Sequence, residues 1–230
     1  MAVVLTALAA ALPALPADLE VNVGGVAVTL PAPFNEYVEA GDRVGDLVSG
    51  FLTPDYRLLA TYLPRNVVAA VSGNKPVHLD NNLVGYVAVM RQVERTDLTP
   101  PLFARAVDAA VDGASPRKVD ATKVRETEQR INLQMRAIGA APLRLGEREI
   151  LGELFRQPNA AGFAVRTGVS MNGHNGTLTG GMAFIRVKNR LLLAWISVEH
   201  ESPDLMDWLT RSLQAWSDVI ILKNGGEIGQ

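Results

Sequence analysis

The alternation of hydrophobic and polar positions is clearest over residues 182–224. Two apolar runs, residues 182–187 and 191–198, are rich in β-branched and aromatic side chains, which is typical of β-strands. The polar connection at 188–190 is so short that the two runs must pair antiparallel, and Asn189 tolerates the positive φ of a tight turn. The second run is almost continuously apolar, which predicts a central strand covered on both faces.

An amphipathic helix is predicted directly after this hairpin. Ser202 has the side chain of an N-cap, Pro203 suits the first helical turn, and Gly225 suits the stop after the last turn. Apolar side chains recur at steps of three and four, which places them on one face of a helix: Leu205, Leu209, Leu213, Trp216 and Ile220. We expect the three tryptophans, Trp195, Trp208 and Trp216, to pack in the core between helix and sheet.

The rest of the chain adds two groups of periodic segments. The predicted strands are a hairpin over 19–30 with its turn at Gly24-Gly25, and residues 56–63, 83–93, 151–157 and 163–171. The predicted helices are residues 42–51, 99–113 and 119–138. The apolar stripe of the second helix consists of Phe103, Val107, Ala110 and Val111. Residues 172–181 contain four glycines and are predicted to be a loop that leads into the 182–198 hairpin.

Strands in this pattern cluster instead of alternating strictly with helices. Such an order predicts an α+β fold: a largely antiparallel β-sheet with helices packed on it, ending in a four-strand meander and a C-terminal amphipathic helix. Residues 18–230 are expected to form a single domain, because no long polar linker divides them. Residues 114–118 are polar and turn-forming, and are expected to be an exposed linker within it.

The first seventeen residues carry the localisation signal. Residues 1–17 are uncharged and rich in Ala, Leu and Val, with the length of a signal-peptide hydrophobic region. Small residues near Ala14 and Ala17 suit cleavage before Asp18, although no Lys or Arg precedes the run. We expect the remnant of an export signal, and therefore a periplasmic or secreted protein. The alternative is a retained, buried N-terminal helix in a cytoplasmic protein.

Composition narrows the classes of function. The chain has 230 residues, of which 48% are hydrophobic, which is ample for a core. Its formal net charge is −2 and its basic residues are scattered, which argues against a dedicated nucleic-acid-binding protein. The absence of cysteine excludes disulfides, thiolate metal sites and cysteine nucleophiles. Nothing else approaches the length of a transmembrane helix, so no transmembrane span is predicted.

The sequence contains no recognised catalytic motif. The nucleophile elbow of α/β-hydrolases, the phosphate-binding Walker loop and the dinucleotide-binding glycine motif are all missing. We therefore predict no catalytic residue, no metal site and no cofactor. Four polar residues remain as candidates for ligand binding, because they combine imidazole and carboxylate groups near the glycine-rich stretch or at a strand end: His174, Glu199, His200 and Glu201.

Three pieces of the chain together resemble a type of uncharacterised exported bacterial protein and, more remotely, the Mog1/PsbP-like α/β sandwich. They are residues 30–34 (Leu-Pro-Ala-Pro-Phe), residues 57–64 (Arg-Leu-Leu-Ala-Thr-Tyr-Leu-Pro), and a terminal unit with Leu193-Ala194-Trp195, Trp208, Trp216 and Asn224. The resemblance implies an antiparallel sheet flanked by helices. It also implies a binding or accessory role more than a catalytic one, although the fold does not fix a function.

Three hypotheses follow for the function. The first is a non-enzymatic exported binding or accessory domain with a protein or small-molecule partner and no nucleic-acid partner. The second is a hydrolase with a dispersed site around Glu199, His200 and the 172–181 stretch, which requires His174 and His200 to line one cleft. The third is an immunity or inhibitor protein that binds a partner protein.

Overall fold

The fold is taken from a computed structural model that describes residues 18–72, 84–113, 121–137, 142–171, 173–198 and 204–228. In this part of the chain the strands are β1 (Leu19–Val23), β2 (Val26–Leu30), β3 (Tyr37–Glu39), β4 (Tyr56–Pro64), β5 (Val84–Met90), β6 (Leu143–Gln157), β7 (Ala160–Met171), β8 (His174–Val187) and β9 (Arg190–Val198). The helices are α1 (Asp42–Phe51), α2 (Arg65–Ser72), α3 (Pro100–Gly113), α4 (Ala121–Ala137) and α5 (Leu205–Lys223). Among these residues, none of the helices has the length and apolar character needed to cross a membrane. The predicted export signal at 1–17 and the predicted linker at 114–118 lie outside the described residues.

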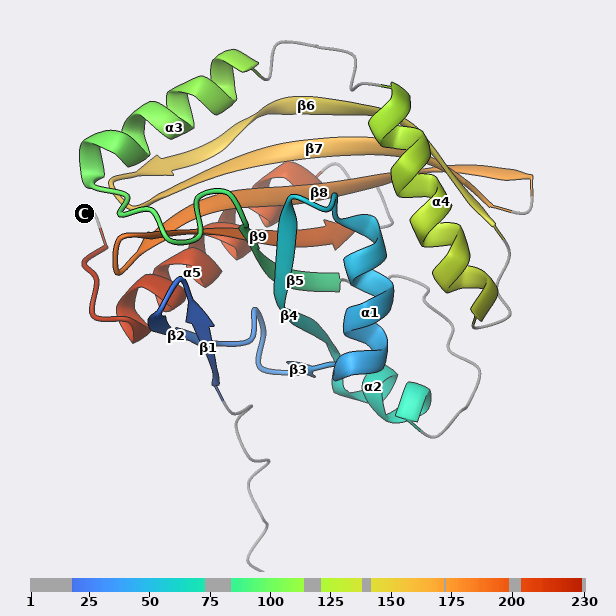
Figure 1. The fold of residues 1–230 in the computed structure, drawn as a ribbon, viewed down its shortest axis with the longest axis horizontal. Helices are drawn as coiled ribbons and strands as arrows, with labels where there is room; N and C mark the ends of the chain where they lie inside the picture. The colour runs from blue at the N-terminus through green and yellow to red at the C-terminus, as the bar shows by residue number, and fades with distance from the viewer. Residues whose placement is uncertain are drawn as a thin grey trace, which may run out of the picture.

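One sheet forms the body of the described structure. Its seven strands run in the order β3-β4-β5-β9-β8-β7-β6, and every neighbouring pair is antiparallel. Strands β6 to β9 follow one another in space as they do in sequence, so the predicted four-strand meander is confirmed. Helix α5 lies on one face of the sheet, while α1, α3 and α4 lie on the other (Figure 1). The predicted α+β fold is confirmed.

The turn between β8 and β9 has the expected geometry. Lys188 and Asn189 have φ angles of 47° and 59°, the left-handed conformation of the tight turns that match the twist of a hairpin. Strand β9 lies between β5 and β8, and its residues 192–197 are all buried. The central position predicted from its continuous apolar run is therefore confirmed.

The loop predicted at 172–181 is wrong for most of its length. Strand β8 begins two residues into this stretch and pairs with β7 without interruption. Its glycines allow close packing within a strand. A Cβ atom on Gly180 would lie 2.5 Å from Cζ2 of Trp195, and one on Gly181 would lie 3.0 Å from Cδ2 of Leu213.

Strand β6 is longer than the predicted 151–157 and begins at Leu143. Its pairing with β7 shifts register at three places along its length. Each such irregularity breaks the two-residue alternation of side chains by which a strand is recognised. The first half of β6 therefore has no clear strand pattern in the sequence.

Helix α5 covers one face of the sheet. Its buried side chains are Leu205, Leu209, Leu213, Trp216, Ser217, Ile220 and Ile221, which confirms the predicted stripe. Trp195 and Trp216 are 8% and 2% exposed, so both belong to the core. Trp208 is half-buried and stacks on Phe34 with ring centroids 5.9 Å apart. The predicted N-cap Ser202 lies outside the described residues, and the helix begins at Leu205.

Residues 29–31, at the end of β2, are held between α5 and the sheet. The indole Nε1 of Trp216 donates a hydrogen bond of 2.9 Å to the carbonyl of Pro31. The hydroxyl of Tyr62, on β4, donates one of 2.9 Å to the carbonyl of Leu30. The two rings meet edge to face with centroids 6.0 Å apart. Burial raises the pKa of Tyr62, so its hydroxyl stays protonated and continues to donate.

The end of α5 is tied to the same segment. The side-chain amide of Asn224 donates a 2.8 Å hydrogen bond to the carbonyl of Thr29, and its oxygen accepts a 2.9 Å hydrogen bond from the Thr29 amide. Gly225 then has a φ of 75°, and the Gly226 amide donates a 3.0 Å hydrogen bond to the carbonyl of Ile221. This is the glycine stop expected for the helix, in the arrangement that satisfies its last carbonyls.

Replacement of Trp216 by alanine should strongly destabilise the protein. The change leaves a cavity between α5 and the sheet and removes a buried hydrogen bond, so we expect a loss of about 3–5 kcal/mol in the free energy of unfolding. Urea unfolding followed by circular dichroism measures the loss. Met206→Ala, at a more exposed position of the same helix, is the matched control and should change stability by less than about 1 kcal/mol. A small loss for Trp216→Ala would contradict its place in the core.

Candidate functional site

The residues proposed from the sequence for a polar site do not form one among the described residues. Glu199, His200 and Glu201 lie outside these residues. The backbone of His174 pairs with Met171 at the turn between β7 and β8. The ligand-binding candidates, and the dispersed hydrolase site around Glu199, His200 and the 172–181 stretch, therefore stay predictions. In the described ranges, no group of three or more His, Asp or Glu side chains is placed to hold a metal ion.

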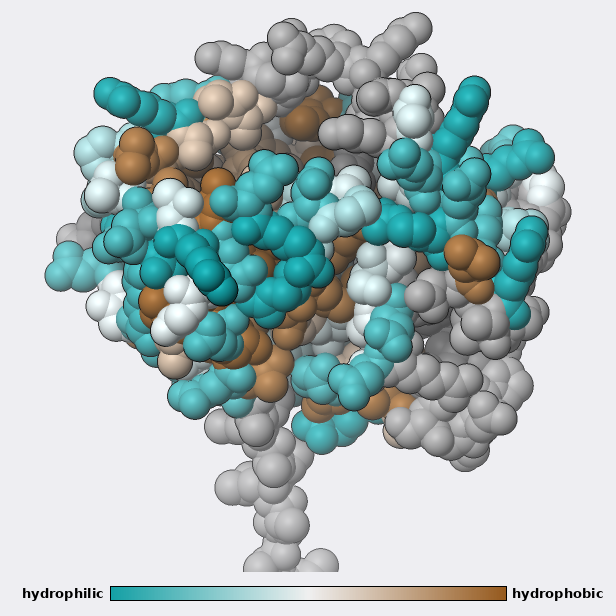
Figure 2. Space-filling model, viewed as in Figure 1, coloured by the Kyte–Doolittle hydropathy of each residue, from teal (hydrophilic) through white to brown (hydrophobic). Residues whose placement is uncertain are grey.

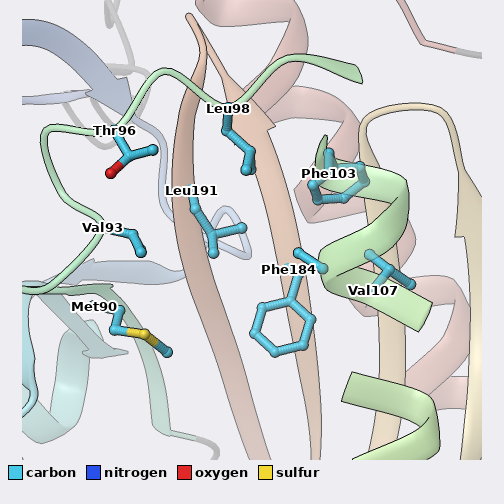
Figure 3. A pocket seen from close by; sticks show the side chains of 9 residues that line it. Met90, Val93, Thr96, Leu98, Phe103, Val107, Phe184 and Leu191 are labelled. Carbon is cyan, nitrogen blue, oxygen red and sulfur yellow. The ribbon is translucent and has the colours of Figure 1, made fainter. Parts of the chain in front are cut away.

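The structure has an apolar pocket on the face of the sheet opposite α5. It has a volume of about 210 Å³ and opens to solvent. Its walls come from α3, from the end of β5, from β8 and β9, and from residues 91–99. Residues 91–99 connect β5 to α3 and are called loop 91–99 below. The lining residues are Met90, Val93, Thr96, Leu98, Phe103, Ala106, Val107, Phe184 and Leu191. Their side chains converge from these separate elements (Figure 3).

Helix α3 supplies the most deeply buried wall of the pocket. Phe103 and Val107 are both 2% exposed and stand one turn apart, so they share one face of the helix. They pack in a cluster with Phe163 of β7, whose ring meets that of Phe184 with centroids 5.9 Å apart. This is the apolar face expected for a helix at 99–113. The buried side chains of this cluster hold the helix on the sheet.

Loop 91–99 is fastened at one side by Glu94. Its carboxylate accepts hydrogen bonds from the guanidinium of Arg57, on β4, and a 3.2 Å hydrogen bond from the Gly24 amide, in the β1–β2 turn. Gly24 has a φ of 56°, and a Cβ there would lie 2.1 Å from the Glu94 carbonyl oxygen. The hydrogen bonds from Arg57 lower the pKa of Glu94, and the Gly24 amide and the charge of Arg91 act in the same direction.

The other side of the loop is fastened to the turn between β8 and β9. The Leu98 amide donates a 2.8 Å hydrogen bond to the carbonyl of Asn189. Arg190 donates to the carboxylate of Asp97 and, at 3.3 Å, to the carbonyl of Thr96. The Arg190 side chain is only 10% exposed, whereas that of Asp97 is 76% exposed. Arg190 therefore works mainly as a buried clamp that fixes the shape of the loop.

The pocket suits one apolar group. A cavity of about 150 Å³ lined by apolar side chains holds a benzene ring, so about 210 Å³ admits an aromatic ring or a branched aliphatic chain. No ionisable side chain is among its lining residues, and Thr96 brings the single hydroxyl. The lining therefore favours binding through contact and desolvation over acid–base chemistry. Figure 2 shows that hydrophilic residues cover most of this face, with hydrophobic surface visible between them.

Sequence patterns identified only part of this pocket. Phe103 and Val107 belong to the predicted stripe of the 99–113 helix, but a stripe does not reveal that part of its face stays uncovered. Loop 91–99 was not recognised as a wall. The available signal was the presence of Val93 and Leu98 in an otherwise charged and polar connection, where apolar side chains are expected only if they are covered.

Comparison with known proteins finds solved structures of low similarity. No family model matches the sequence, and neither does any curated protein. A solved structure of a mutant of the protein Mog1 covers 90% of this chain and 94% of its own, with 12% identity and a TM-score of 0.29. The Saccharomyces cerevisiae Ran-binding protein Mog1p covers 91% and 94%, with 11% identity and a TM-score of 0.28. Both are structures of Mog1 proteins, and at this similarity neither fold nor function is carried over from them.

Replacement of Glu94 by glutamine should destabilise the protein in a pH-dependent way. The pKa of Glu94 is lowered in the folded state, so its stabilising effect is complete above the ordinary carboxyl pKa of about 4.3 and is lost as pH falls through the folded value. Because the pair with Arg57 is partly exposed, we expect a loss of about 1 kcal/mol at neutral pH.

Urea unfolding at a series of pH values measures this difference between variant and wild type. It should shrink toward zero in acid. Glu126→Gln, at an exposed position of α4, is the control and should show no such trend. A Glu94→Gln difference that stays constant down to strongly acid pH would contradict the role of the carboxylate charge.

Proposed function

We propose that the protein is a non-catalytic binding module that takes an apolar side chain of a partner protein into the pocket between α3, loop 91–99 and β8–β9. The observation that supports the proposal is the pocket itself: an open, apolar hollow bounded by a helix and a loop that are both held in place. Interfaces depend on a few apolar anchors that fill such hollows and exclude water around them.

The size of the pocket favours a side chain over a free small molecule. Pockets that enclose a drug-sized ligand have volumes of roughly 300–1,000 Å³ and bury most of the ligand surface. At about 210 Å³ and open to solvent, this pocket takes one ring or one branched chain and leaves the rest of the bound molecule outside. A protein partner satisfies this condition, since its remaining surface can rest on the rim.

The surroundings of the pocket also have the character of an interface. Leu102, on α3, is 43% exposed and adds apolar surface next to the lining residue Phe103. Polar and charged residues of loop 91–99 alternate with the lining residues and are mostly exposed. An apolar centre with a polar rim is the usual anatomy of a protein–protein contact. An inhibitor or immunity protein would be one form of such a module.

We further propose that the module acts in the bacterial envelope or outside the cell. The support for this location is the uncharged apolar run of residues 1–17, which has the length of a signal-peptide hydrophobic region. Mass spectrometry of the mature protein from its native host tests it. A mature chain that begins at Asp18 is expected, and a retained run of residues 1–17 would contradict an exported protein.

Filling the pocket should abolish partner binding. We expect wild-type protein to select, from a displayed library of random peptides, sequences that share one aromatic or branched aliphatic residue. Ala106→Phe places a ring in the pocket from α3 and should weaken binding of a selected peptide about tenfold or more, as the loss of an interface anchor does. Fluorescence anisotropy with the labelled peptide measures the dissociation constant.

The matched control is Ala109→Phe, which adds the same ring at an exposed position of α3 that is not among the lining residues. It should bind as the wild type does, and thermal unfolding should show that both variants are folded. Equal binding by Ala106→Phe and wild type, or a wild type that selects no peptide, would refute the proposal.

A further inference from the structure

We propose that the partner segment bound at this pocket is acidic: one apolar anchor residue flanked by aspartate or glutamate. This inference rests on the proposed function and specifies the chemistry of the partner. It is drawn from the charges of loop 91–99 and the first turns of α3, which surround the pocket on two sides.

The charge of this region is unbalanced once its salt bridges are assigned. Loop 91–99 and residues 100–108 of α3 carry three carboxylates, and each forms a salt bridge: Glu94 with Arg57, Asp97 with Arg190 and Asp108 with Arg156. Three arginines of the same stretch form no salt bridge with a carboxylate of the described residues: Arg91, Arg95 and Arg105. All three are exposed.

Each of these arginines stands close to the pocket along the chain. Arg91 directly follows the lining residue Met90, Arg95 directly precedes Thr96, and Arg105 directly precedes Ala106. Arg91 and Arg95 therefore flank lining residues of the loop, while Arg105 stands on the exposed side of α3, about 100° around the helix from Ala106. The guanidinium of Arg91 already has one partner, because its Nε donates a 3.2 Å hydrogen bond to the carbonyl of Pro54. Arg95 and Arg105 are the two without such a contact among the described residues.

A basic border around an apolar pocket selects for the opposite charge on the partner. Guanidinium groups bind carboxylates with two parallel hydrogen bonds, and exposed charges of one sign steer a partner of the other sign into contact. The whole chain has a formal net charge of −2, so this positive border is a local feature and not a consequence of overall composition. Like charges placed opposite the border would be repelled, which adds specificity.

The test uses three synthetic peptides and the full-length protein. The first peptide carries a central phenylalanine flanked on both sides by two glutamates, the second has lysines in place of the glutamates, and the third keeps the glutamates but has a central alanine. Isothermal titration or fluorescence anisotropy gives each dissociation constant. We expect the first peptide to bind about tenfold or more tightly than either of the others, and to weaken as salt is raised.

Charge reversal on the protein provides the complementary arm. The double variant Arg95→Glu with Arg105→Glu should lose about tenfold or more in affinity for the glutamate-flanked phenylalanine peptide. Arg211→Glu is the matched control, because Arg211 is exposed on α5, on the other face of the sheet. It should bind as the wild type does. Both variants change exposed residues, and circular dichroism confirms that they are folded.

The outcomes separate this inference from the proposed function. Equal affinity for the glutamate- and lysine-flanked phenylalanine peptides would overturn the acidic partner and leave the apolar anchor standing. Equal affinity for the phenylalanine and alanine peptides with glutamate flanks would overturn the anchor and leave only charge attraction. No measurable binding of the first peptide would overturn both.

Discussion

The structure depends on the contact between helix α5 and residues 29–31, at the end of strand β2. Trp216 and Asn224 contact residues that lie about 190 positions earlier in the chain, through hydrogen bonds to Pro31 and Thr29. Both contacts are satisfied polar groups within a buried apolar surface, where an unpaired carbonyl or indole would be costly. The early and late parts of the chain are in this way held to one face of the sheet.

Because this contact closes one face of the sheet, the pocket can form only on the other face. With α5 and the β1–β2 hairpin closing one side, the strands in the middle of the sheet still present apolar side chains to the opposite side. Helix α3 covers part of that surface through Phe103 and Val107, and loop 91–99 borders the rest. The loop is fixed at two hairpin turns, by Glu94 at the first and by Arg190 at the second. The pocket is the space between two firmly held walls.

The parts of the fold with regularly spaced hydrophobic positions or a clear turn signal could be predicted from the sequence. The stripe of α5, the tight turn at Asn189 and the central position of β9 each follow from one local rule. The mispredicted parts, in β8 and β6, have local sequence patterns that are determined by contacts with residues elsewhere in the sheet. Gly180 looks like a loop residue, but the strand needs a glycine there because the ring of Trp195 occupies the space. Register shifts in β6 likewise hide its strand pattern.

The pocket could not be predicted from the sequence, for a related reason. A hydrophobic stripe shows that a helix has an apolar face, and it does not show how much of that face its neighbours cover. The exposure of the pocket depends on the path of loop 91–99, which is set by contacts with Gly24 and Asn189 from far along the chain. The polar candidates Glu199, His200 and Glu201 rest on side-chain chemistry alone, and they lie outside the described residues.

The most direct test of this account is a methyl chemical-shift map of the protein on addition of the glutamate-flanked phenylalanine peptide. Ring-current shifts from a bound aromatic ring fall off within a few ångströms, so they locate the anchor. We expect the largest shifts at methyl groups that line the pocket: those of Val93, Leu98, Val107 and Leu191. The methyl groups of Leu213 and Ile220, on the α5 side, should stay unchanged. Largest shifts on the α5 side, or shifts spread evenly over the core, would contradict the assignment of the pocket as the binding site.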